Sequence, residues 1–79
     1  MKIKIMETKY YPLFSVDTCE SEWAMSYVLI GAESPEDLIK HWKQTGEHRP
    51  KGLKDRITAI PDAFTTTPYT VIDRYGYYE

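Results

Sequence analysis

The sequence predicts an α+β fold in which one short helix packs on one face of a largely antiparallel sheet. Two observations lead to this prediction. Several segments alternate apolar and polar residues as half-buried strands do, and one segment carries a helix cap followed by an apolar stripe. The expected order along the chain is β-β-α-β-β. A length of 79 residues predicts a single small domain, residues 1–79, that buries about 60% of its unfolded surface.

The helix is expected near residues 35–45, within the segment ESPEDLIKHWKQTG. Ser34 can cap the first turn, Pro35 suits the first helical position, and Gly46 is expected to end the helix. A helix this short is marginal in isolation, so its apolar stripe must pack on another element. That stripe consists of Leu38, Ile39 and Trp42.

Four strands are expected, near residues 2–7 with an extension to 16, 23–32, 56–60 and 69–75. The first opens with alternating Lys and Ile, and Pro12 in its extension indicates an edge, a bend or a bulge. The second, WAMSYVLIGA, is rich in β-branched and aromatic residues, which favours a strand. The fourth lies in the segment YTVIDRYGYY, where Gly76, just after the expected range, indicates a bulge or fraying.

The segment 51–60 is open to two interpretations. Leu53, Ile57 and Ile60 match helical spacing, but the segment is short and bounded by Gly52 and Pro61. These bounds favour a strand near 56–60. The residues that follow, AFTTTP, are expected to form a connector.

A single helix covers one face of a sheet, so the second face is expected to lack cover. In the second strand the small and branched residues share one parity, and the bulky residues share the other. Exposed apolar patches of this kind are typical of interfaces. The alternative, in which N-terminal residues such as Tyr10 and Phe14 fold over this face and make it core, stays open. The expected partner-binding residues of the bulky face are Trp23, Met25, Tyr27, Tyr69, Tyr75 and Tyr77.

A basic run from Lys40 to Arg56 holds six Lys or Arg, two His and two acids, within a chain of net charge −2. Part of the run is explained by the helix, because Glu36 lies four residues before Lys40 and Lys43 lies near the negative end of the dipole. An acidic block precedes the run. The charged flanks expected to contact a partner are Glu20, Glu22, Arg49, Lys51, Lys54 and Arg56.

The sequence contains no pattern typical of catalysis or metal binding. His41 and His48 lie on either side of Gly46, without an HExxH motif, paired Cys or a phosphate-binding Gly loop. Acidic neighbours make the single cysteine, Cys19, a poor nucleophile. We therefore expect no enzyme activity, no cofactor and no metal. Without a signal-peptide pattern or an apolar span of about 20 residues, the chain is expected to be a soluble cytoplasmic protein.

The expected function is that of a small non-enzymatic interaction module of inhibitor, adaptor or regulator type. It would bind a protein partner, or a second copy as a homodimer, through the bulky face and the charged flanks. Phages and other mobile elements encode many domains of this size, so the expectation includes a viral protein. The alternative is single-stranded nucleic-acid binding through the basic run and the sheet Tyr residues, although a pI near 5.6 argues against it.

Overall fold

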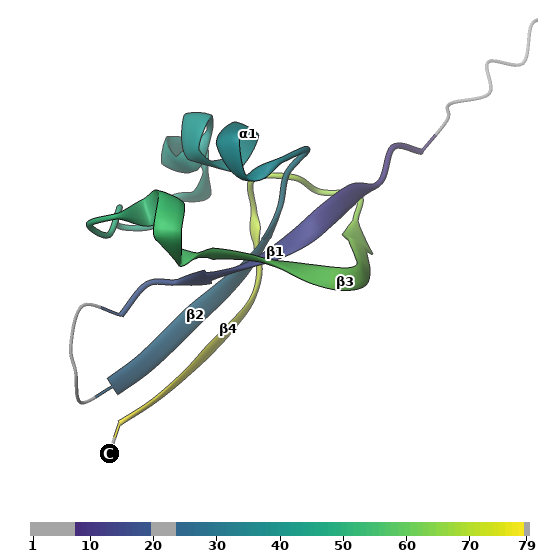
Figure 1. Cartoon of the computed structure of the whole chain (residues 1–79). Coiled ribbons are helices and arrows are strands. Elements are labelled where there is room, and N and C mark those ends of the chain that lie inside the picture. Colours follow the sequence, from purple (N-terminus) through teal and green to yellow (C-terminus); the bar gives the residue numbers. More distant parts are fainter. Residues whose placement is uncertain (1–7, 20–23, 79) are drawn as a thin grey trace, which may run out of the picture.

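The computed structural model describes residues 8–19 and 24–78, and it contains a four-stranded antiparallel sheet with helical segments on one side (Figure 1). These elements confirm the predicted α+β class and the order β-β-α-β-β, with short 3-10 helices added after the α-helix. The strand expected near residues 2–7 lies outside the described residues. The elements are β1 (Tyr11–Asp17), β2 (Ala24–Gly31), α1 (Pro35–Lys40), η1 (Trp42–Thr45), η2 (Leu53–Arg56), β3 (Ile57–Thr65) and β4 (Val71–Tyr78).

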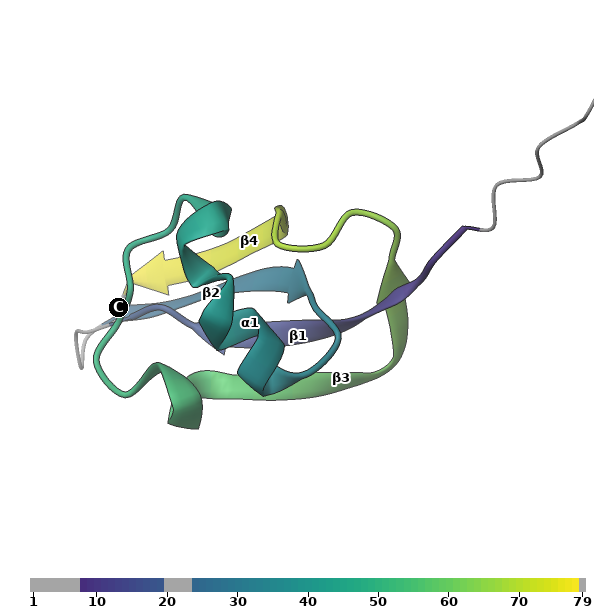
Figure 2. The same cartoon turned by 90° about the horizontal axis from the view of Figure 1, so that it is seen from above.

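The strands are arranged in the order β3-β1-β2-β4, so two strands that follow each other in the chain form the opposite edges of the sheet. Residues 66–70 connect these edges by crossing the end of the sheet where β2 stops (Figure 2). Pro68 forms a bridge with Gly31, and the Tyr69 backbone N–H donates to the Gly31 carbonyl at 2.9 Å. The connection is therefore attached to the central strand.

The α-helix begins as the sequence predicts and ends earlier. The Ser34 hydroxyl accepts a hydrogen bond from the Asp37 backbone N–H at 3.0 Å, and Pro35 occupies the first turn. The α-helix ends at Lys40, and the rest of the expected range forms η1 in 3-10 geometry. Gly46, with φ of 76°, then ends the helical segment in the left-handed region, as predicted.

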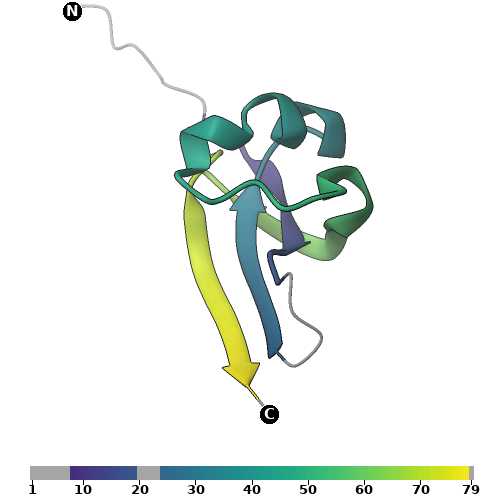
Figure 3. The same cartoon turned by 90° about the vertical axis from the view of Figure 1, so that its left-hand side faces the viewer.

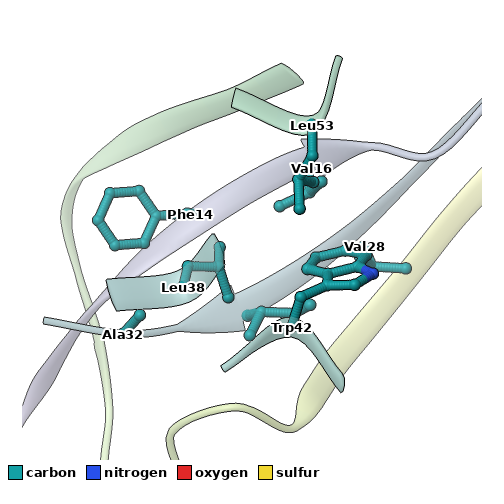
Figure 4. Close-up of a cluster of buried hydrophobic side chains, with 8 residues drawn as sticks. Phe14, Val16, Val28, Ala32, Leu38, Trp42 and Leu53 are labelled. Carbon is teal, nitrogen blue, oxygen red and sulfur yellow. The ribbon is translucent and has the colours of Figure 1, made fainter. Parts of the chain in front are cut away.

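The core lies between the sheet and the helical segments (Figure 4). Two cross-strand pairs, Phe14–Ile30 and Val16–Val28, supply its sheet side. Leu38 is fully buried and Trp42 is 3% exposed, which confirms the predicted apolar stripe, and Leu53 of η2 closes the cluster. The Trp42 Nε1 atom has no hydrogen-bond acceptor among the described residues. All of these side chains lie on the same side of the sheet.

The segment 51–60, for which the sequence allowed either a helix or a strand, contains both. Residues 53–56 form η2, with Leu53 directed into the core, and β3 then runs from Ile57 to Thr65. The strand therefore continues past Pro61, where the sequence analysis ended it, and takes in part of the expected connector. Pro61 is tolerated because β3 is an edge strand and one side of its backbone needs no partner. Asp62, with φ of 57°, marks the irregular part of this edge.

Within the described residues, no helix combines the length and apolar character needed to cross a membrane.

Candidate interaction surface

The two faces of the sheet are distinguished by the alternation of side chains along β1, β2 and β4. Val28 pairs with Arg74 and with Val16, whereas Tyr27 pairs with Tyr75 and with Asp17. Because opposed residues in paired strands point to the same side, these registers identify one set of side chains directed away from the core. We call this set the outer face: Leu13, Ser15, Asp17, Met25, Tyr27, Leu29, Asp73 and Tyr75.

The centre of the outer face is apolar and accessible to solvent. Met25 is 43% exposed and Tyr75 is 50% exposed, while Tyr27 and Leu29 between them are half-buried. All the helical segments lie on the opposite side of the sheet (Figure 3). The Tyr27 hydroxyl lies 3.8 Å from the Met25 sulfur and donates to it. The sheet thus presents a patch of aromatic, thioether and aliphatic groups in a defined register.

Of the residues expected on this face, Met25, Tyr27 and Tyr75 lie together there. The backbone of Tyr77 pairs with Met25, which places it at a register position of the same parity. Trp23 lies outside the described residues. The register of β1 with β2 ends at Asp17 and Tyr27, and one further backbone hydrogen bond joins Thr18 N–H to the Ser26 carbonyl at 2.9 Å. Met25 pairs with Tyr77 of β4, so this end of the surface is formed by β2 and β4.

The prediction that Tyr69 belongs to this face is wrong. The register between β2 and β4 shifts between Leu29 and Ile30, so Ile72 is an extra residue and Val71 lies opposite Ile30. A bulge of this kind reverses the side to which all the preceding residues point. Val71 and Tyr69 therefore pack against the core side. Strict alternation along the fourth strand could not reveal this shift.

Tyr69 instead attaches the β3–β4 connection to the α-helix. Its hydroxyl donates to Asp37 Oδ2 at 2.6 Å, and its ring stacks on His41 with centroids 4.4 Å apart. Asp37 Oδ1 also lies 3.1 Å from His41 Nδ1, and Asp37 Oδ2 accepts from the Glu33 backbone N–H. The bond from Tyr69 is the main reason why the pKa of Asp37 is lowered, and the same bond raises the pKa of Tyr69 to about 12. The contacts of this cluster are all within the chain.

Carboxylates border the apolar centre of the outer face. Asp73 accepts a hydrogen bond from the Tyr75 hydroxyl at 2.9 Å and one from the Arg74 backbone N–H at 2.8 Å. The first of these bonds raises the pKa of Tyr75, because a neighbouring negative charge disfavours the tyrosinate. Asp17 lies beside Tyr27 on the other border, with its Oδ1 atom 3.7 Å from Arg56 Nη1.

The basic run lies on the helical side of the molecule. Its exposed cations belong to α1, η1, η2 and the loop between the 3-10 helices: Lys40, Lys43, Arg49, Lys51 and Lys54. Arg56 is half-buried, and its guanidinium donates to the backbone carbonyls of Lys51 at 2.8 Å and Cys19 at 2.6 Å. Arg56 thus holds η2 against the end of β1. Glu20 and Glu22 lie outside the described residues.

The described residues of the outer face present aromatic, aliphatic, thioether and carboxylate groups at the surface. Among residues 8–19 and 24–78, no group of three His, Cys, Asp or Glu side chains could hold a metal ion. Comparison of the chain with protein-family models, with curated proteins and with solved structures gave no match. The outer face is distinguished by its aromatic and apolar composition and by its position on the side of the sheet opposite the helical segments.

Proposed function

We propose that the chain is a small non-enzymatic module that binds a protein partner through its outer face. The observation that carries this proposal is the exposure of Met25 and Tyr75 beside Tyr27 on a sheet whose opposite face holds the core. Tyr and Met are enriched at protein interfaces, and a rigid sheet presents them without a large loss of conformational freedom on binding. The module acts as an inhibitor, adaptor or regulator in the cytoplasm.

The nucleic-acid alternative receives less support from the geometry. It requires the cations of the basic run and the stacking rings of the sheet to contact one strand. Lys43 and Lys54 lie on helical segments, whereas Tyr27 and Tyr75 lie on the outer face, on the other side of the sheet. A single strand would have to pass around an edge of the sheet to contact both. A protein that docks on the outer face alone needs no such path.

The test compares two exposed aromatic residues at different places on the sheet. Tyr75 is 50% exposed on the outer face, and Phe64 is 59% exposed near the end of β3, opposite Pro12. Tyr75→Ser and Phe64→Ser each remove one ring of similar exposure, so they form a matched pair. Immobilised wild-type protein and both variants, each checked for an unchanged melting temperature, are incubated with extract of the source cell.

A partner recovered by the wild-type protein and by Phe64→Ser, but lost with Tyr75→Ser, is the expected result. Equal recovery by all three proteins would contradict the proposal, because the ring of Tyr75 would then contribute nothing to binding. Failure of the wild-type protein to recover any protein would also count against it.

A further inference from the structure

Carboxylates and cations are unequally distributed between the two sides of the sheet. The charged side chains of the outer face are Asp17 and Asp73, both carboxylates. Arg74 follows Asp73 directly in β4, but it pairs with Val28 of the buried parity and forms an ion pair with Glu47 on the helical side. Arg74 is thus directed away from the outer face, and Arg56 lies 3.7 Å from the Asp17 carboxylate. Among the described residues, Asp73 is therefore the carboxylate of this face that has no ion pair within the chain.

The carboxylates stand next to aromatic rings in fixed positions. Tyr27 and Tyr75 are directly opposed across β2 and β4, and the Tyr75 hydroxyl is held by Asp73 at 2.9 Å. Tyr rings attract cations through their faces, and a carboxylate beside the ring adds a charge-assisted hydrogen bond. A guanidinium or ammonium group is the ligand that satisfies both at once. Met25 supplies apolar area for the aliphatic stem of such a side chain.

A second copy of the chain does not supply this complement in a face-to-face dimer. In a two-fold dimer the same patch is present on both sides, so rings and carboxylates would meet rings and carboxylates. Opposed carboxylates such as those of Asp73 would then disfavour the contact, since like charges across an interface reduce affinity. Charge complementarity therefore favours a different chain that brings cations to the outer face.

We infer that the occupant of the outer face is a cationic segment of another protein, whose Arg or Lys side chains lie on the rings of Tyr27 and Tyr75 and pair with Asp73. The inference rests on the proposed function and adds the chemistry of the partner. Asp17 is a weaker contributor because Arg56 already lies 3.7 Å from its carboxylate. Asp73 accepts hydrogen bonds from the Tyr75 hydroxyl and from the Arg74 backbone N–H, and neither of these donors is a cationic group.

The test uses a fluorescently labelled oligo-arginine peptide as the probe and an oligo-glutamate peptide of equal length as its control. Asp73→Asn removes one charge from the outer face, and Asp55→Asn removes one from the exposed surface of η2. Each substitution changes the net charge from −2 to −1, so the pair separates local recognition from general attraction. Tyr75→Leu removes the phenol and keeps apolar bulk. Binding is followed by fluorescence anisotropy of the full-length protein.

The expected result is binding of oligo-arginine only, weakened about two- to fivefold by Asp73→Asn, as for the loss of one exposed charge pair. Tyr75→Leu should weaken binding to a similar extent, and Asp55→Asn should leave it unchanged. Equal weakening by both Asn variants, or no binding of oligo-arginine, would overturn the inference. Light scattering that shows concentration-dependent association lost in Asp73→Asn would overturn it too, because the cationic side of a second copy would then be the occupant.

Failure of this inference is distinguishable from failure of the proposed function. A natural partner whose recovery depends on Tyr75, but is unaffected by Asp73→Asn, would leave the docking function in place and remove the cationic segment. If the recovery of no partner depended on Tyr75, both the docking function and the cationic partner would be contradicted.

Discussion

The two faces of β2 differ in what they contribute although their residues alternate along the same strand. Val28 and Ile30 are 2% and 0% exposed beneath the helical segments, whereas Met25 is 43% exposed on the outer face. Burial of apolar surface supplies most of the folding free energy, so the inner side determines stability. The described part of the fold is therefore stabilised mainly from one side of the sheet, and substitutions on the outer face should cost little stability.

Two hydrogen bonds between Tyr and Asp repeat this contrast. The Tyr69 hydroxyl donates to Asp37 across 32 positions in the chain, and it joins the β3–β4 connection to the α-helix. The Tyr75 hydroxyl donates to Asp73, two positions away on the same strand. The first bond can form only when distant elements are assembled. The second is local and restricts only one edge strand.

Truncation of a large apolar side chain should reduce the free energy of unfolding far more in the core than on the outer face. Leu38→Ala removes a fully buried side chain and should destabilise the fold by about 2–5 kcal/mol. A core in a chain of this size rarely supplies more than about 3–5 kcal/mol, so the variant should be largely unfolded at room temperature. Met25→Ala should cost less than about 1 kcal/mol, because Met25 is a partly exposed surface residue. Urea denaturation followed by circular dichroism measures both.

Ile30→Val provides a milder inner-face change, with an expected cost of about 0.5–1.5 kcal/mol, in case Leu38→Ala cannot be measured. A cost for Met25→Ala as large as that for Leu38→Ala would mean that the outer face is a second core, and the contrast between the faces would be lost.

At the end of β2, the outer side of the sheet is covered by the chain itself, and Gly31 lies at this covered position. Gly31 is buried and pairs with Leu13, and a Cβ atom added there would overlap the Cγ2 methyl of Thr65. Gly31→Ala should therefore destabilise the fold by about 1–3 kcal/mol, as overpacking does. The measurement is again urea denaturation, with the wild-type protein in the same buffer.

Thr65→Ser gives the matched control for this prediction. Serine lacks the overlapping methyl group and keeps the hydroxyl that accepts from the Thr67 backbone N–H at 3.1 Å. The double variant Gly31→Ala with Thr65→Ser should be more stable than Gly31→Ala alone. If Thr65→Ser gave no rescue, the close approach of Thr65 would not be the reason for a glycine at this position.

The sequence predicted what depends on neighbouring residues. The Ser34 cap, the stripe containing Leu38 and Trp42, and the buried parity of Val28 and Ile30 follow from local spacing, and the structure confirms each of them. Local spacing holds there because no irregularity interrupts the pairing of β1 with β2 from Leu13 to Asp17.

The remaining features depend on long-range contacts that a single sequence does not display. The bulge at Ile72 places Tyr69 on the core side, and the β3–β4 connection that follows β3 is bridged to Gly31 at the end of the sheet. The Arg56 guanidinium donates to the carbonyl of Cys19, 37 positions away, a contact within the chain that the sequence did not indicate. In both cases the decisive partner lies far along the chain, so residue type and spacing carried no signal for it.

The two Tyr–Asp hydrogen bonds should differ, by a small amount of free energy, in how they make stability depend on pH. The pKa of Asp37 is lowered from 3.8, chiefly by the Tyr69 hydroxyl, so its contribution to stability is present above about pH 3.8 and is lost as the pH falls through the lower folded-state value. Tyr69→Phe should therefore reduce stability at neutral pH and flatten the acid decline. Tyr75→Phe, which removes a local bond, should change neither.

The alkaline limb gives an independent check on Tyr69→Phe. The pKa of Tyr69 is raised from 10.0 to about 12, so the stabilisation by its hydroxyl is complete below pH 10 and is lost as the pH rises toward 12. Chemical denaturation at a series of pH values should show this decline in the wild-type protein and a weaker one in Tyr69→Phe. Parallel curves for the wild-type protein, Tyr69→Phe and Tyr75→Phe would show that the long-range bond contributes no more than the local one, because a hydroxyl that joins two elements must change stability when it ionises.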